Sequence, residues 1–171
     1  MKVLSALIVA AVSAAPVFAA SSSTDADFVT KAAQAGMAEV AAGKLAASKG
    51  ESPAVKKFGQ RMVRDHTKAN EELKSVASKS GATVPASPSP EQKAAGQQLE
   101  TMQGAEFDEA YARQMVKDHE EAVELFRKES TSGSDAGLKA FAAKTLPTLQ
   151  QHLEMAKELP SGGGGTSPGS Q

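Results

Sequence analysis

The sequence predicts an all-α fold: a ferritin-like four-helix bundle with a long crossover between the second and third long helices, plus one short extra helix. Between Asp25 and Leu159, Ala, Lys, Glu, Gln, Leu and Met dominate, and all are strong helix formers. Four long segments repeat apolar residues with the helical period and are separated by turn signals. The connection between the second and third segments is long enough to run the length of a bundle, which is typical of ferritin-like folds.

The first two helices are predicted to form a hairpin with a short turn. The first covers residues 25–49 and ends at Gly50. The second begins with Ser52 as its N-cap and Pro53 in its first turn, and it stops at Gly81. The residues expected to face inward are Val29, Ala33, Gly36, Met37 and Val40 in the first helix, and Val55, Gly59, Met62, His66, Ala69, Leu73 and Val76 in the second.

The next segment, "GATVPASPSPEQ", is rich in proline and cannot be helical throughout. A short helix over residues 90–103, capped by Ser89, is predicted to follow. The third long helix covers residues 105–130, and the fourth runs from its cap at Ser134 to about Leu159, with a kink at Pro147. The inward-facing residues are Phe107, Tyr111, Met115, His119, Ala122 and Phe126 in the third, and Leu138, Phe141, Thr145, Leu149, His152 and Ala156 in the fourth.

Both ends of the chain are predicted to lie outside this domain. Residues 1–19 resemble a secretory signal peptide, because Lys2 precedes an apolar run and Val17-Phe18-Ala19 fits a cleavage site. We expect cleavage after Ala19, export to the periplasm, a flexible N-terminus over residues 20–24 and one bundle domain over residues 25–159. Residues 160–171, rich in Gly and Ser, are expected to be disordered. No later segment approaches a membrane-spanning length.

The composition narrows the classes of partner. A formal net charge of -1 gives no electrostatic reason to expect nucleic acid. The chain has no Cys, which excludes disulfides and thiol chemistry, and with no Trp and one Tyr it lacks the usual stacking residues. An unidentified protein or a small ligand remains as the expected partner, and the oligomeric state stays open.

The most unusual feature is a repeated pentad, "MVRDH" at residues 62–66 and "MVKDH" at residues 115–119. Spacing of four residues stacks Met62 on His66 and Met115 on His119, each pair on one helical face. Both histidines lie near the middle of their helices, so they are predicted to meet in the centre of the bundle, with Met37 within reach.

His152 is predicted to lie away from this cluster. Counted outward from the turn near Ser132, His152 lies seven residues farther along its helix than His119 lies along its own. An offset of seven residues corresponds to about 10 Å along a helix. Thr145 and Leu146 are therefore expected to face His119, and a three-histidine site would need a distortion at Pro147.

Two interpretations of the pentads follow. In the first, the imidazoles are packing residues oriented by the flanking carboxylates of Asp65 and Asp118, and the methionines fill gaps in the core. In the second, Met62, His66, Met115 and His119 bind a metal ion. The di-iron motif Glu-x-x-His is absent, and thioether with imidazole suits copper, especially Cu(I). No nucleophile with a base and an orienting group is visible, so no catalytic residue is predicted.

Three segments resemble one exported bacterial family, the domain of unknown function 4142, which is often labelled an outer membrane protein: "FGQRMVRDHTKANEEL", "GAEFDEAYARQMVKDHEEAVELF" and "LKAFAAKTLPTLQQHLEMAKEL". The matching motifs are Asp65-His66, Asp118-His119 and Leu146-Pro147 with His152. The resemblance implies a ferritin-like bundle in the periplasm and no established activity. A sister ferritin-like family associated with copper carries His-His where this chain carries Asp-His.

Two functions are therefore predicted. The first is an exported periplasmic helical-bundle protein with a non-enzymatic role, either in binding a partner or in stress. The alternative is a periplasmic copper-binding protein that uses the Met-x-x-x-His pairs of two helices.

Overall fold

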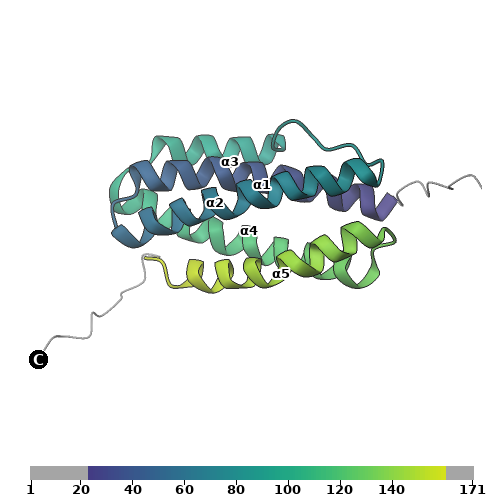
Figure 1. Cartoon of the computed structure of the whole chain (residues 1–171). Coiled ribbons are helices and arrows are strands. Elements are labelled where there is room, and N and C mark those ends of the chain that lie inside the picture. Colours follow the sequence, from purple (N-terminus) through teal and green to yellow (C-terminus); the bar gives the residue numbers. More distant parts are fainter. Residues whose placement is uncertain (1–22, 161–171) are drawn as a thin grey trace, which may run out of the picture.

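The computed structural model describes residues 23–160, which form five helices and no strand, so the predicted all-α bundle is confirmed. The long helices are α1 (Ser23–Lys49), α2 (Pro53–Lys79), α4 (Gly104–Ser132) and α5 (Ala136–Lys157), and the short one is α3 (Pro90–Thr101). α1 packs against α2 and α4, and α5 packs against the same two helices (Figure 1). The helices α2 and α4, which carry the pentads, therefore face each other diagonally across the bundle.

The predicted crossover is present between α2 and α4. The chain leaves α2, loops around one end of the bundle and returns along its length as α3 (Figure 1). Ser89 caps α3 as predicted, because its hydroxyl accepts from the backbone N–H of Gln92 and the Gln92 side chain accepts from the N–H of Ser89. α3 lies against α1 and covers part of the seam between α1 and α4.

The helix starts follow the sequence with one correction. Ser52 caps α2 as predicted, with its side chain accepting from the backbone N–H of Val55. The cap of α5 is Asp135 and not Ser134: the Asp135 carboxylate accepts from the backbone N–H of Leu138 at 2.8 Å. Ser134 belongs to the turn before this cap, where its backbone N–H donates to Asp25 at 2.9 Å.

Two buried aspartates hold the two tight turns of the bundle. Asp25, in the first turn of α1, accepts from the backbone N–H groups of Ser134 and Asp135 between α4 and α5. Asp108, near the start of α4, accepts from those of Glu51 and Ser52 between α1 and α2. The two aspartates are 83 residues apart, and the same interval separates other matched pairs, namely Gly50 and Gly133, Ser52 and Asp135, Val55 and Leu138, and Phe58 and Phe141. The hairpin α1–α2 is thus repeated as α4–α5.

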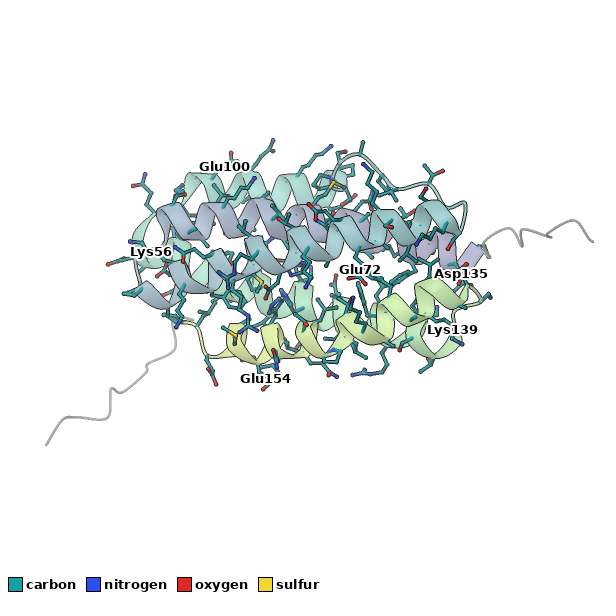
Figure 2. All side chains as sticks on the ribbon, viewed as in Figure 1. Lys56, Glu72, Glu100, Asp135, Lys139 and Glu154 are labelled. Carbon is teal, nitrogen blue, oxygen red and sulfur yellow. The ribbon has the colours of Figure 1, made fainter. Side chains whose placement is uncertain are left out.

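The core consists of two apolar clusters at either end of the bundle. We call the first the phenylalanine cluster; it includes Phe28, Leu73, Phe126, Leu138, Phe141 and Leu149. We call the second the methionine cluster; it includes Phe58, Met62, Leu99, Phe107, Tyr111 and Met115. Charged side chains such as Lys56, Glu100 and Glu154 project outward (Figure 2). The three histidines belong to neither cluster and lie between them.

Some predictions concern residues outside the described part of the chain. The signal peptide over residues 1–19, the start of the flexible N-terminus and the tail from residue 161 onward all lie there. Among residues 23–160, no helix combines the length and the apolar character that crossing a membrane requires.

Candidate metal centre

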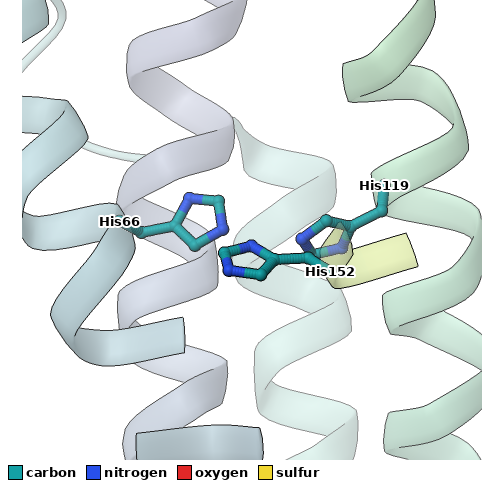
Figure 3. A group of neighbouring side chains, drawn as sticks. All are labelled: His66, His119 and His152. Carbon is teal, nitrogen blue, oxygen red and sulfur yellow. The ribbon is translucent and has the colours of Figure 1, made fainter. Parts of the chain in front are cut away.

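Three imidazole rings converge at the middle of the bundle, each from a different helix (Figure 3). His66 lies on α2, His119 on α4 and His152 on α5, and all three are buried. The ring centroids of His66 and His119 are 5.6 Å apart, and each is 5.4 Å from that of His152. One nitrogen from each ring lies within 4.8 Å of the other two. The arrangement is therefore a group of three nitrogen donors around one point.

Two of the rings have their proton position fixed by a partner outside this group. Nδ1 of His119 lies 2.9 Å from the carbonyl oxygen of Met115, which can only accept, so this nitrogen carries the proton. Nε2 of His152 lies 2.9 Å from Oδ2 of Asp65 and likewise donates. The remaining nitrogens, Nε2 of His119 and Nδ1 of His152, are consequently unprotonated in the neutral rings. Both are buried without a hydrogen-bond partner among residues 23–160, as is Nε2 of His66.

A second layer of contacts orients His152. The Arg61 guanidinium donates to Asp65 at 3.2 Å and to Gln151 at 3.1 Å, which ties α2 to α5 beside the ring. Partial burial would raise the pKa of Asp65, but the hydrogen bonds from His152 and Arg61 lower it overall. A carboxylate that accepts from a histidine in this way fixes the tautomer and direction of a ligating ring. Asp65 thus orients a histidine, as the packing interpretation expected of it, but the ring is His152 and not its neighbour His66.

Burial keeps all three rings neutral at pH 7. Desolvation, followed by the proximity of the other two imidazoles, lowers the pKa of His66 to about 3. Desolvation and His152 lower the pKa of His119 to about 4. The pKa of His152 is also lowered, because desolvation outweighs the opposing effect of Asp65. Neutral imidazole is the form that binds a metal, so the lone pairs are available without deprotonation.

The rings border a cavity of about 40 Å³. The polar groups on its wall, apart from the histidines, are Glu39, Asp65, Asn70, Asp118, Thr145 and Thr148. The volume is enough for a water molecule or a small ion. Three nitrogens bound to one Zn²⁺ at roughly 2.0–2.1 Å lie about 3.3–3.6 Å apart. The observed limit of 4.8 Å is wider than this separation, so the rings must move toward one another to bind one ion.

The position of His152 corrects the sequence prediction, which placed this ring away from the other two along the helix axis. The count ran both helices from Ser132, but residues 133–135 form the turn and α5 begins only at Ala136. Measured from the end of α4 and from the start of α5, His119 and His152 differ in depth by only three residues. An offset of three residues is about 4.5 Å, which a side chain spans. In addition, α5 changes direction along its length, and Pro147 lies inside it (Figure 1).

The two pentad methionines lie apart from the cavity. Met62 and Met115 are fully buried in the methionine cluster and are not among the residues that line the cavity. Met37 is only half-buried and does not line it either. Pro147 is exposed. Asp118 lines the cavity, and burial followed by the charge of Glu121 raises its pKa.

Sequence reasoning missed Glu39, a buried acid on α1. Its Oε1 lies 3.8 Å from Nδ1 of His119, and burial followed by the charge of Asp118 raises the pKa of Glu39 well above its usual value. Glu39 is not among the residues predicted to face inward in the first helix. Its spacing gives the available signal, because Glu39 follows Ala32 and Gly36 by seven and three residues on one helical face.

The comparisons with known proteins agree with the fold. The family model described as a domain of unknown function (DUF4142) matches residues 10–159. The chain belongs to the DUF4142 family. A solved structure, described as a DUF305 fragment from Deinococcus radiodurans, aligns with a TM-score of 0.70 and 12% identity over 81% of this chain and 95% of that chain. At this identity the DUF305 likeness shows the fold alone. No curated protein matches the DUF4142 chain.

Proposed function

We propose that this DUF4142 protein binds one transition-metal ion through His66, His119 and His152. The observation that carries the proposal is the cluster of three buried imidazoles, in which one nitrogen of each ring lies within 4.8 Å of one nitrogen of each other ring. One nitrogen of each ring also has no hydrogen-bond partner in the described part of the chain. Leaving a buried acceptor unpaired costs about 1–3 kcal/mol. A single cation at the centre of the group removes this cost for all three at once.

The donor set selects the class of metal. Three imidazoles suit Zn²⁺, copper, Ni²⁺ or Fe²⁺, whereas Mg²⁺ and Ca²⁺ prefer oxygen. Cu²⁺ is expected to bind most tightly, since it stands highest in the affinity order of divalent first-row metals. The sequence argument for Cu(I) relied on the sulfurs of Met62 and Met115, which lie outside the cavity. The proposal therefore moves the site from two Met-His pairs to three histidines, with Zn²⁺ and Cu²⁺ as the metals to test.

Titration of metal-free protein tests this function. We expect one Zn²⁺ or Cu²⁺ per chain by calorimetry and elemental analysis. His66→Gln, His119→Gln and His152→Gln should each weaken binding by more than the 10–100-fold typical of losing an outer-shell partner. Glu120→Gln, an exposed change beside His119, is the matched control and should bind like the parent protein. Equal binding by the triple histidine variant, with helicity intact, would rule the site out.

We further propose that the metal is bound after export to the periplasm. The support is the pattern of residues 1–19, in which Lys2 precedes an apolar run and a cleavage site at Ala19. Mass spectrometry of the periplasmic fraction is expected to find an N-terminus at Ala20. Recovery of the chain only from the cytoplasm with Met1 intact would contradict export.

A further inference from the structure

A second hollow lies outside the bundle, where the start of α3 meets α1 and α4. Its volume is about 370 Å³. Four carboxylates line it, from Glu39, Glu91, Asp118 and Glu121, whereas the basic side chain that lines it is that of Lys31. The excess of acidic over basic side chains favours cations in this hollow.

The hollow and the central cavity share a wall. Ala35 and Glu39 of α1 and Asp118 and Ala122 of α4 line both. Ala35 and Ala122 carry only a methyl group each, so their side chains leave room for a passage between α1 and α4. The other two are carboxylates, which are ligands for a divalent cation.

Glu39 is an unpaired buried acid in this wall. The residue is only 5% exposed, and its Oε2 has no hydrogen-bond partner among residues 23–160. A cation that binds this carboxyl takes the place of its proton and gives the unpartnered oxygen a ligand. Because Glu39 borders the acidic hollow on one side and the histidine cavity on the other, a cation that moves between them would meet this oxygen.

The opposite seam of the bundle, between α2 and α5, is bridged by ion pairs and hydrogen bonds. The Arg61 guanidinium lies on Asp65 there, next to His152. The Lys144 ammonium pairs with Glu72 across the same seam at 2.6 Å. Because Asp65 and Glu72 are already paired with basic side chains, neither carboxylate is free to receive a metal ion from that side.

We propose that a divalent transition-metal ion enters the centre through the α1–α4 wall, where the carboxylates of Glu39 and Asp118 take it from the hollow and pass it to the three imidazoles. This inference rests on the proposed metal-binding function. It assigns Glu39 and Asp118 to metal transfer, and it makes them determinants of how fast the centre loads.

Stopped-flow mixing with Cu²⁺ tests the path. Tyr111 is the one tyrosine of a chain without Trp, and its ring packs edge-on against Phe58, which packs against His152. Tyrosine fluorescence therefore reports Cu²⁺ arrival at the centre by quenching. Glu39→Gln and Asp118→Asn should each slow loading about tenfold or more, the lower end of electrostatic guidance effects. The dissociation constant should change less than the loading rate, because release uses the same path.

Two further variants make the result decisive. Ala122→Leu narrows the shared wall without changing charge and should also slow loading. Glu120→Gln removes a charge from the same helix outside the hollow and should leave the rate within about twofold, since an exposed charge beyond the path is screened by salt. Slow loading in the first three variants alone supports the path. If Asp118→Asn and Ala122→Leu both load at the rate of the parent protein, the proposed path is wrong, although metal binding itself stands. If the parent protein does not bind Cu²⁺, the proposed function is wrong instead.

Discussion

At the scale of single residues, the centre depends on where the protons of His119 and His152 lie. The Met115 carbonyl and the Asp65 carboxylate hold the protons of His119 and His152 on the outer side of each ring. The other nitrogen of each of these two rings is then an unprotonated acceptor without a hydrogen-bond partner among residues 23–160. Neutral rings that only packed together would not require this arrangement, so it favours a cation at the centre.

The pH titration of the imidazoles tests this residue-scale account. In metal-free protein, NMR signals of His66 and His119 should titrate with midpoints of about 3 and 4, well below the ordinary value of 6.5. The unfolded chain takes up protons near pH 6.5 while these folded rings stay neutral. The contribution of these rings to stability should therefore fall as the pH drops from 6.5 toward 4, by up to about 1.4 kcal/mol per pH unit for each ring. Midpoints near 6.5 would contradict the buried, neutral cluster.

The orienting role of Asp65 gives a second prediction. Asp65→Asn keeps the side-chain volume but removes the charge that fixes the His152 proton. Zn²⁺ affinity measured by calorimetry is expected to fall about 10–100-fold. The exposed change Glu71→Gln on the same helix is the control and should have no effect. Unchanged affinity in Asp65→Asn would show that this carboxylate does not act on the site.

The sequence predicted part of the residue-scale picture. The repeated pentads correctly brought His66 and His119 together, because a helical stripe determines which side chains face inward. The placement of His152 depended on the length of one turn and on the course of α5, which periodicity does not give. Glu39 was missed because the inward-facing stripe of the first helix was drawn from apolar and small residues, which leaves out an acid.

At the scale of helices, the close approach of α1 and α2 depends on two glycines. A Cβ added at Gly59 would lie 2.7 Å from the carbonyl oxygen of Gly43 and 2.8 Å from the backbone nitrogen of Ala47. Neither backbone atom can rotate away. The helices must therefore separate to accommodate any larger residue.

Two alanine substitutions should consequently have opposite effects. Gly59→Ala is expected to destabilise the fold by about 1–3 kcal/mol through overpacking, despite its better helix propensity. Gly96→Ala in α3, where an added Cβ meets no atom within 4 Å, should stabilise it by up to about 1 kcal/mol. Urea unfolding measures both. Stabilisation by Gly59→Ala would contradict the close helix contact.

A pair of buried carboxyl groups couples α4 to α1 and to the following turn. Burial, followed by the charge of Asp25 and a hydrogen bond to it, raises the pKa of Glu129 to about 7, with Asp135 adding to the effect and Lys139 opposing it. The folded protein thus holds a proton between pH 4.5 and 7 that the unfolded chain lacks. Its stabilising effect is present at low pH and is lost as the pH rises through 7.

Replacing this acid should remove that dependence. Relative to the parent protein, Glu129→Gln is expected to be more stable at pH 8 than at pH 5, by about 1–2 kcal/mol in the unfolding free energy. The histidine contributions are the same in both proteins and cancel. Glu124→Gln, an exposed change on the same helix, should show no such difference. A parallel pH profile for Glu129→Gln would show that the pair does not share a proton.

At the scale of the whole molecule, the fold class could be predicted because the spacing of apolar residues along the chain indicates long helices well. The four long helices, the Ser52 and Ser89 caps and the crossover were predicted and are confirmed. The 83-residue repeat of the two hairpins was not predicted from the sequence. Its clearest members are the two aspartates that hold the turns, and these do not belong to the apolar pattern of the helices. The cavity between the two apolar clusters depends on three-dimensional packing, and a linear pattern does not encode it.

Each of α2, α4 and α5 supplies one imidazole to the buried group, and we propose that this group holds a metal ion. X-ray absorption spectroscopy of the Zn²⁺-loaded protein tests this most directly. We predict three imidazole nitrogens at about 2.0–2.1 Å from one zinc ion. A spectrum with oxygen ligands and fewer than three imidazoles, unchanged in the triple histidine variant, would contradict it.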